Sequence, residues 1–305
     1  MRRVGLVVLL LIAAGLALAG YAYGISWNGK GPLTAPATVT VPEGATLRSM
    51  AKRLQDAKAI GSSEAFLLGA RLFGSKEGIR AGEYQVPAGA SNAEILALLQ
   101  SGKTIQQLIT IPEGMPSILV YERLMANKDL DGPINIPPEG SVLPDSYSYE
   151  RGERRVAVLA RMQAAMSKFL AEQWPKREKG LLVQNVNEAL SLASIVEKET
   201  SIAKERPVVA GVYYNRLRDG MRLQADPTII YPITKGKPLG RRIRQSEIAA
   251  VNGYNTYSMV GLPVGPIANP GRSSIQAVLQ PETTKALYFV ADGQGGHIFA
   301  ETYAE

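Results

Sequence analysis

The chain has 305 residues, of which 46% are hydrophobic and 20% are charged, with a net charge of +7. This composition supplies a sizeable core, in two domains rather than one, and excludes a disordered tail or a histone-like binder. With no cysteine and a single histidine, His297, it also excludes disulfide scaffolds, thiolate zinc sites, cysteine nucleophiles and histidine-rich metal sites. Any catalysis must rest on carboxylates, hydroxyls, amides and cations, so we expect no metal and no organic cofactor.

The amino terminus reads as a membrane anchor. Two arginines precede residues 4–29, which contain no charged residue. About 20 apolar residues span a bilayer, and aromatic residues favour its boundary with water. We therefore predict an N-terminal transmembrane helix within residues 1–29, with the aromatic residues Tyr21, Tyr23 and Trp27 near its outer end. A cleaved signal peptide is the alternative, because residues 17–19 resemble a small-residue cleavage site.

Both interpretations export the rest of the chain. The anchor predicts a single pass through the bacterial inner (plasma) membrane, with a cytoplasmic amino terminus and a periplasmic body. The basic run over residues 235–244 is then a solvated loop, or a contact for anionic cell-wall polymer or lipid head groups, and no nucleic-acid partner is expected.

One local device recurs three times after a short linker. A short strand leads into a Pro-x-Gly turn and then an amphipathic helix, over residues 39–54, 84–99 and 108–124. Proline fixes φ at the first corner of such a turn, and glycine accepts the positive φ that follows. Ser91 or Asn92 and Ser117 are the expected N-caps.

The remaining elements make the chain an α+β protein. Hydrophobic spacing predicts helices over residues 62–72, 154–174, 184–200 and 205–219. Residues 286–300 predict a hairpin, because Asp292-Gly293 lies between two apolar runs. The strands are short and mostly antiparallel.

The helix over residues 184–200 carries the strongest chemical signal. Residues three, four and seven positions before Glu199 are all aliphatic, so its carboxyl is the one charged group on an apolar stripe. Such a carboxyl near a helix carboxyl end resists ionisation and suits general-acid work on a glycosidic bond. The alternative is a structural role, in which Glu199 pairs with a cation such as Arg216. Glu197 lies on a smaller and more polar face.

The loops that follow are rich in side chains suited to a sugar groove. Tyrosine, asparagine, glutamine and threonine supply flat faces and directional hydrogen-bonding groups, between glycines and prolines that stiffen the loops. Each of these residues also has a turn-forming interpretation. His297 follows a hairpin turn and has no partner motif that would make it a triad base.

The order of these motifs resembles one known family. Residues 193–200 read ASIVEKET and residues 221–228 read MRLQADPT, followed by YNTY at 254–257, GLP at 261–263, ANPG at 268–271 and YFVADG at 288–293. The set resembles the YceG-like (MltG) endolytic murein transglycosylases over nearly the whole chain. This resemblance implies a LysM-like α/β region at residues 30–106 and a mixed α+β catalytic domain at residues 107–305.

The resemblance also implies a reaction. It implies cleavage of the β-1,4 bond between N-acetylmuramic acid and N-acetylglucosamine in nascent peptidoglycan, leaving a 1,6-anhydro end. Glu199 would be the general acid and then the base. Substrate contacts are predicted at Gln224, Asp226, Thr228, Tyr254, Asn255, Thr256, Tyr257 and Asn269, with support from Glu197, Asn215 and Arg216.

Two other functions remain open from the sequence. One is a membrane-anchored scaffold that binds peptidoglycan and uses Glu199 only structurally. The other is a muramidase, in which Asp226 serves as the second carboxylate that hydrolysis usually requires. Expected partners are glycan strands, the membrane and peptidoglycan synthases of the penicillin-binding class.

Overall fold

The computed structural model describes residues 13–15, 20 and 23–305. Within that part of the chain, no helix combines the length and apolar character that crossing a membrane requires. Most of the predicted anchor, and the predicted cleavage site at residues 17–19, lie outside the described residues.

The chain divides into two compact units, Met1–Gln107 and Leu108–Glu305. In the first unit, β1 (Ala37–Val41) pairs antiparallel with β2 (Gly82–Val86), so that Val39 lies opposite Tyr84. The helices of this unit are α2 (Leu47–Asp56), α3 (Ser63–Phe73) and α4 (Asn92–Ser101).

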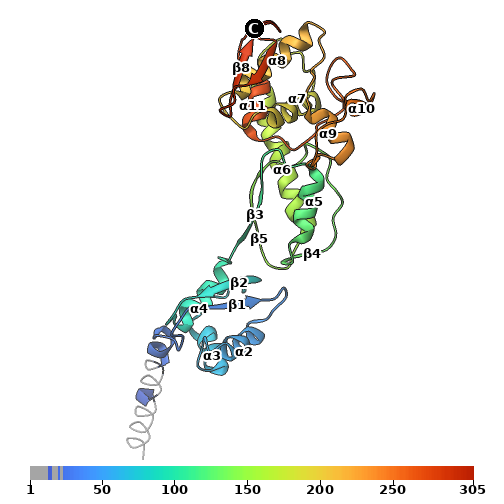
Figure 1. Cartoon of the computed structure of the whole chain (residues 1–305). Helices are drawn as coiled ribbons and strands as arrows, with labels where there is room; N and C mark the ends of the chain where they lie inside the picture. The colour runs from blue at the N-terminus through green and yellow to red at the C-terminus, as the bar shows by residue number, and fades with distance from the viewer. Residues whose placement is uncertain (1–12, 16–19, 21–22) are drawn as a thin grey trace, which may run out of the picture. The chain divides into compact units, whose positions relative to one another are not determined.

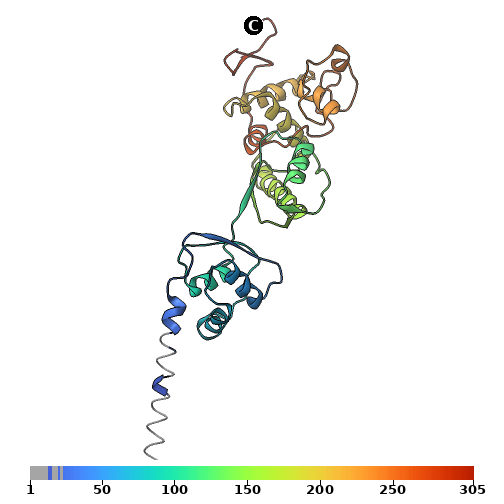
Figure 2. The same ribbon diagram turned by 60° about the horizontal axis from the view of Figure 1, so that its bottom comes forward.

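These helices cover one face of the strand pair (Figure 1, Figure 2). Alternate residues of each strand are buried, because successive side chains of a strand point to opposite faces. They share a core with the helices that is centred on Tyr84, Phe66, Met50, Leu54 and Ile95. The LysM-like assignment of this unit stays a prediction.

Residues 23–28 are helical and pack onto this same core. The indole of Trp27 is only 4% exposed and contacts the rings of Phe66 and Phe73. The Tyr23 ring stacks on Phe73, and its hydroxyl donates a hydrogen bond to the Ala65 carbonyl. The prediction that Trp27 lies at a membrane boundary is therefore wrong for its side chain, because protein buries the indole.

The second unit begins with the third copy of the recurring device. It contains β3 (Gln107–Ile111), α5 (Ser117–Ala126), β4 (Leu130–Asp131), β5 (Asp145–Tyr149), β6 (Glu153–Arg154) and α6 (Arg155–Gln173). β3 pairs with β5, and β4 pairs with β6 in parallel. All three predicted strand–turn–helix units are confirmed, and Gly44, Gly89 and Gly114 have φ near +70° at their turns.

The predicted caps hold in part. Ser91 caps α4, with its hydroxyl accepting from the Glu94 amide and the Glu94 carboxylate accepting in return from the Ser91 amide. Ser117 does not cap α5, because Pro116 occupies the N-cap position. The Ser117 hydroxyl instead donates to the carbonyl of Pro138.

The rest of the second unit surrounds one helix. Its elements are η1 (Trp174–Lys176), α7 (Val186–Glu199), α8 (Arg206–Arg218), α9 (Pro227–Thr234), α10 (Gln245–Ile248), α11 (Arg272–Leu279), β7 (Tyr288–Ala291) and β8 (His297–Ala300). In Figure 1, α7 lies among α8, α9 and α11. β7 and β8 form the predicted antiparallel hairpin.

Three of these helices were not predicted. Helices α9, α10 and α11 fall in stretches that the sequence presented as loops, because proline and glycine flank them. Pro227 instead occupies the first turn of α9, where no intrahelical partner for an amide is needed. The α+β class holds, with helix as the larger part of the second unit.

Candidate active site

Helix α7 is the buried centre of the second unit. Asn185 caps it by accepting a hydrogen bond from the Glu188 amide at 3.0 Å. Every residue from Ala189 to Val196 is buried, so both faces of the helix contact other elements. Glu199 is its last residue and Thr200 its C-cap. The burial of the helix fixes the position of its final carboxyl.

The Glu199 carboxyl is held away from water. Its Oε1 atom is buried and has no hydrogen-bond partner among the described residues. The pKa of Glu199 is raised from 4.5 to about 7. Burial is the main cause, the Tyr213 hydroxyl opposes it, and the negative charge of Asp226 adds to it. His297 and Arg216 also lower this pKa, by smaller amounts. Near neutral pH the group can therefore hold or release a proton.

Three elements bring charges and hydroxyls to this carboxyl. Tyr213 and Arg216 come from α8, Asp226 is the N-cap of α9, and His297 begins β8. The Arg216 guanidinium donates from Nε to the Leu287 carbonyl and from Nη1 to the Leu223 carbonyl, both at 2.7 Å. Its charge therefore stays near Glu199 without an ion pair to that carboxylate, since both bonds go to carbonyls.

Asp226 and Tyr257 form a hydrogen-bonded pair close to Glu199. The Tyr257 hydroxyl donates to Asp226 Oδ1 at 2.6 Å. Burial first, and then Asp226, raise the pKa of Tyr257, with a smaller contribution from Glu199. Asp226 thus acts on the charge of the Glu199 carboxyl, and Tyr257 lies within reach of the charge of Glu199.

Glu197 has a different environment. Its side chain is 5% exposed, and Oε1 pairs with Arg206 Nη2 at 3.0 Å. Its other oxygen accepts from the Gly271 amide at 2.8 Å. Arg206 also pairs with Glu113 at 3.1 Å. Glu197 therefore joins α7 to α8 and α11, and its predicted support of the catalytic site stays a prediction.

Four of the predicted sugar-contact residues have structural roles instead, and this corrects their assignment. Thr228, Thr256, Asn255 and Asn269 are each 0% exposed. The Thr228 and Thr256 hydroxyls bond to each other at 2.8 Å. A substrate cannot reach these groups, since the protein's own polar atoms already occupy them.

The two buried asparagines hold loops in place. Asn255 Nδ2 donates to the carbonyls of Ile248 and Ala250 at 2.9 and 2.7 Å. Asn269 donates to the Met115 carbonyl at 2.9 Å and accepts from the Val142 amide at 3.0 Å. Asn269 thereby joins the loop before α11 to two distant segments of the same unit.

The other predicted residues are partly exposed or hold neighbouring segments in place. Gln224 is exposed and has φ of +52°, and its amide donates to the Thr256 carbonyl. The half-buried ring of Tyr254 packs 4.8 Å from that of Tyr231. Asn215 Nδ2 donates to the carbonyls of Thr284 and Ala286, which holds the segment before β7 against α8.

His297 has the partner that its sequence context did not reveal. Its Nδ1 lies 2.7 Å from Glu205 Oε2, and its amide donates to Glu205 Oε1 at 2.9 Å. The same carboxylate accepts from the Thr200 hydroxyl at 2.8 Å. Burial alone raises the pKa of Glu205, but these bonds outweigh it and leave the pKa below its ordinary value.

Sequence reasoning also missed Tyr213. It is 1% exposed, and its ring contacts the edge of Phe289 at 5.9 Å. Burial, and next the charge of Glu199, raise its pKa far above its ordinary value, so it remains a neutral donor. Its place one turn before Leu217 on an apolar face resembled that of an ordinary core residue.

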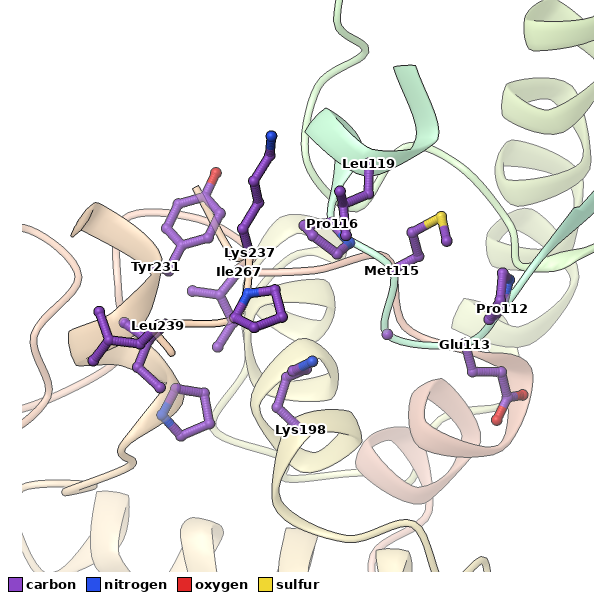
Figure 3. Close-up of a pocket in the computed structure, with 15 residues that line it drawn as sticks. Pro112, Glu113, Met115, Pro116, Leu119, Lys198, Tyr231, Lys237, Leu239 and Ile267 are labelled. Carbon is purple, nitrogen blue, oxygen red and sulfur yellow. The ribbon is translucent and has the colours of Figure 1, made fainter. Parts of the chain in front are cut away.

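The second unit also contains a cavity of 480 Å³. Its lining comes from the turn before α5, from α9 and from the segment after it, together with Lys198 of α7 (Figure 3). Glu199 is not among the described residues that line it, but its neighbour Lys198 is. Likewise Pro227 lines the cavity, next to Asp226.

Within the described residues, no group of three or more histidine, cysteine, aspartate or glutamate side chains has a metal-binding arrangement. The candidate site combines the Glu199 carboxyl with the Asp226 carboxylate, tyrosine hydroxyls and cationic neighbours, and these groups are able to transfer protons.

Comparison with known proteins places the chain in a family. The YceG-like family model matches residues 39–305. The chain belongs to the YceG-like family. A YceG-like protein from Listeria monocytogenes has a similar crystal structure, with a TM-score of 0.56, 27% identity and coverage of 89% of this chain and 98% of that one.

Two curated relatives in the family carry the name endolytic murein transglycosylase. The Bacillus subtilis protein is 28% identical over 88% of this chain and 82% of its own length. The Streptococcus pneumoniae protein of strain D39 is 28% identical over 86% of this chain and 55% of its own length. The chain thus spans about half of the streptococcal relative.

Proposed function

We propose that this protein is a lytic transglycosylase that cleaves peptidoglycan between N-acetylmuramic acid and N-acetylglucosamine, inside the strand. Its YceG-like membership and the names of its curated relatives support the reaction class. One observation supports Glu199 as the acid: a buried carboxyl oxygen that has no hydrogen-bond partner among residues 13–15, 20 and 23–305, in a group whose pKa is raised to about 7.

The reaction needs only one carboxyl that cycles a proton. Protonated Glu199 donates to the glycosidic oxygen as the bond from that oxygen to the muramic acid C1 breaks. The resulting carboxylate then takes the proton of the C6 hydroxyl of the same sugar, while O6 bonds to C1. The atoms balance without water, and the product carries a 1,6-anhydro ring.

The neighbours of Glu199 suit these two states. Burial favours the neutral acid before the first step, because a charged form loses solvation there. Tyr213, Arg216 and His297 each favour the carboxylate, which is the form needed for the second step. These three residues lower the pKa of Glu199, whereas burial raises it. The balance keeps this pKa near neutral pH, where one carboxyl can act first as an acid and then as a base.

The decisive experiment compares Glu199→Gln with the parent protein on purified glycan strands, with mass spectrometry of the products. We expect the glutamine variant to lose about 10²–10⁴-fold in rate, the usual contribution of a positioned acid–base group. A matched control is Glu188→Gln at the start of the same helix. Undiminished release of anhydro ends by Glu199→Gln would contradict the assignment.

The same products distinguish the alternatives. Asp226 influences Glu199, so a two-carboxylate muramidase has a specific residue in its favour. A muramidase product carries one additional water, whereas a lyase product carries the anhydro ring. Strands left intact by the parent protein would favour the binding scaffold.

We further propose that the uncharged stretch before Tyr23 anchors the protein in the bacterial inner membrane, with its body in the periplasm near peptidoglycan synthases. The uncharged stretch after two arginines supports this. Membrane fractionation tests it, because deletion of residues 4–22 should release the protein from the membrane fraction. A full-length protein that fractionates as a soluble species would contradict it.

A further inference from the structure

We propose that the cavity beside Lys198 binds the peptide stem of the muramic acid that is cut, with the Lys198 ammonium pairing with a carboxylate of that stem. This inference rests on the proposed function. It adds a subsite, a ligand class and a specificity-determining residue to the reaction.

The first argument is position along two separate elements. On α7, Lys198 lines the cavity and the next residue is Glu199. At the start of α9, Pro227 lines the cavity and the preceding residue, Asp226, acts on the charge of Glu199. On both elements, a residue that lines the cavity is thus followed or preceded directly by a residue of the candidate active site. We infer from this that the cavity and the active site are adjacent.

The second argument is the connectivity of the substrate. The acid must reach the oxygen on C1 of a muramic acid, and the peptide stem leaves C3 of that same ring through its lactyl group. A protein surface next to the acid therefore lies no farther from the start of the stem than the width of one sugar ring. The stem combines small apolar residues with free carboxylates.

The third argument is the chemistry of the lining. Its walls are largely apolar, with Met115, Pro116, Leu119, Leu239 and Ile267 among them. A volume of 480 Å³ falls in the range of sites that enclose a ligand of several residues or rings. Apolar walls with one cation suit an acidic peptide with alanine side chains better than they suit a bare, hydroxyl-rich glycan.

The fourth argument is the state of the charged residues in the lining. Glu113 pairs with Arg206, and Lys237 pairs with Glu122. Lys198 makes no ion pair or hydrogen bond with any residue that the structure describes, and Figure 3 shows its side chain rising from α7 toward the rest of the lining. The cavity therefore offers one uncommitted positive charge, and a stem carboxylate complements it.

The test measures kcat and KM on two soluble substrates, glycan strands with intact stems and the same strands stripped of stems by an amidase. The parent protein should show a kcat/KM about tenfold higher on the stem-bearing strands, as one charged hydrogen bond supports. Lys198→Ala should bring this ratio close to one, mainly through KM, and Lys198→Arg should restore much of it. Lys168→Ala, an exposed lysine on α6, is the matched control and should keep the full ratio.

A third substrate separates the carboxylate from the bulk of the peptide. Stems whose carboxylates are amidated should lose most of the advantage over stripped strands with the parent protein, and Lys198→Glu should prefer them to the acidic stems. Equal kcat/KM on acidic, amidated and stripped strands by the parent protein would overturn the subsite while leaving the transglycosylase intact. Failure of the parent protein to cut any of the three would instead overturn the proposed function.

Discussion

Glu197 and Glu199 lie two residues apart at the end of the same helix, yet the structure puts their carboxyls in opposite electrostatic states. Glu197 has a buried ion pair with Arg206 and a backbone donor at Gly271. Glu199 has a buried oxygen with no hydrogen-bond partner in the described part of the chain, and its pKa is raised to about 7. A step of two residues turns a side chain by about 200° around a helix, so the neighbours of one cannot serve the other. One carboxyl is structural, and the other is free for chemistry.

The pH dependence of cleavage should report this raised pKa. Since the first step needs protonated Glu199, kcat/KM should fall about tenfold per pH unit above about 7. Rates on soluble strands between pH 5 and 9 measure this alkaline limb. A rate that stays constant through pH 9 would exclude Glu199 as the acid.

Two conservative substitutions should move that limb in opposite directions. Tyr213→Phe removes a hydroxyl that lowers the pKa of Glu199, so the limb should move to higher pH. Asp226→Asn removes a negative charge that raises the same pKa, so the limb should move to lower pH. Shifts of the same sign, or none, would show that these residues do not act on Glu199.

Protein stability should depend on pH through the same carboxyl. Its folded pKa is raised above its ordinary 4.5 to about 7, so the folded state binds the extra proton. The free energy of unfolding should then be greatest below pH 4.5 and decrease as pH rises to about 7, by at most about 3 kcal/mol from this group.

Glu199→Gln cannot titrate, so comparing its stability with that of the parent protein isolates the contribution of this carboxyl. At pH 8 the variant should be more stable than the parent protein by up to about 3 kcal/mol, and at pH 4 the two should be similar. Urea unfolding at both pH values measures the difference. A variant less stable than the parent at pH 8 would indicate a structural role for Glu199.

Substitution of Glu197, in contrast to that of Glu199, should destabilise the folded protein. Glu197→Ala removes one partner of a buried ion pair, leaves the Arg206 charge less compensated and should cost about 3 kcal/mol of unfolding free energy. Glu113→Ala is the control, because Glu113 is 46% exposed, and it should cost less than about 1 kcal/mol. Equal losses of unfolding free energy in the two variants would mean that burial does not make the Glu197–Arg206 pair more important than the Glu113–Arg206 pair.

Local signals were sufficient for much of the secondary structure. Hydrophobic spacing and capping residues predicted α3, α6, α7 and α8 to within one or two residues, because these patterns act over a single turn or face. Helices α9 and α11 escaped prediction. Their short apolar runs follow prolines and glycines that also suit turns, and contacts with α7 and α8 stabilise them.

For the candidate site, the apolar stripe of one helix was enough to select Glu199 over Glu197, since helical periodicity depends on sequence alone. The family motifs likewise pointed to Asp226 and Tyr257, which the structure brings together. The same motifs suggested Asn255, Thr256, Thr228 and Asn269 as sugar contacts, whereas their burial makes them loop supports. A motif records which residue is present but not which way its side chain faces.

The sequence by itself therefore determined the reaction class to expect, most of the α+β elements and the candidate for the acid. Only the tertiary structure decided what surrounds that acid: Tyr213 from α8, His297 from the distant hairpin and the Glu205 carboxylate that holds it. Those partners are separated by up to 92 positions along the chain. Their proximity depends on how the buried faces of several helices pack together, and no local pattern encodes that packing.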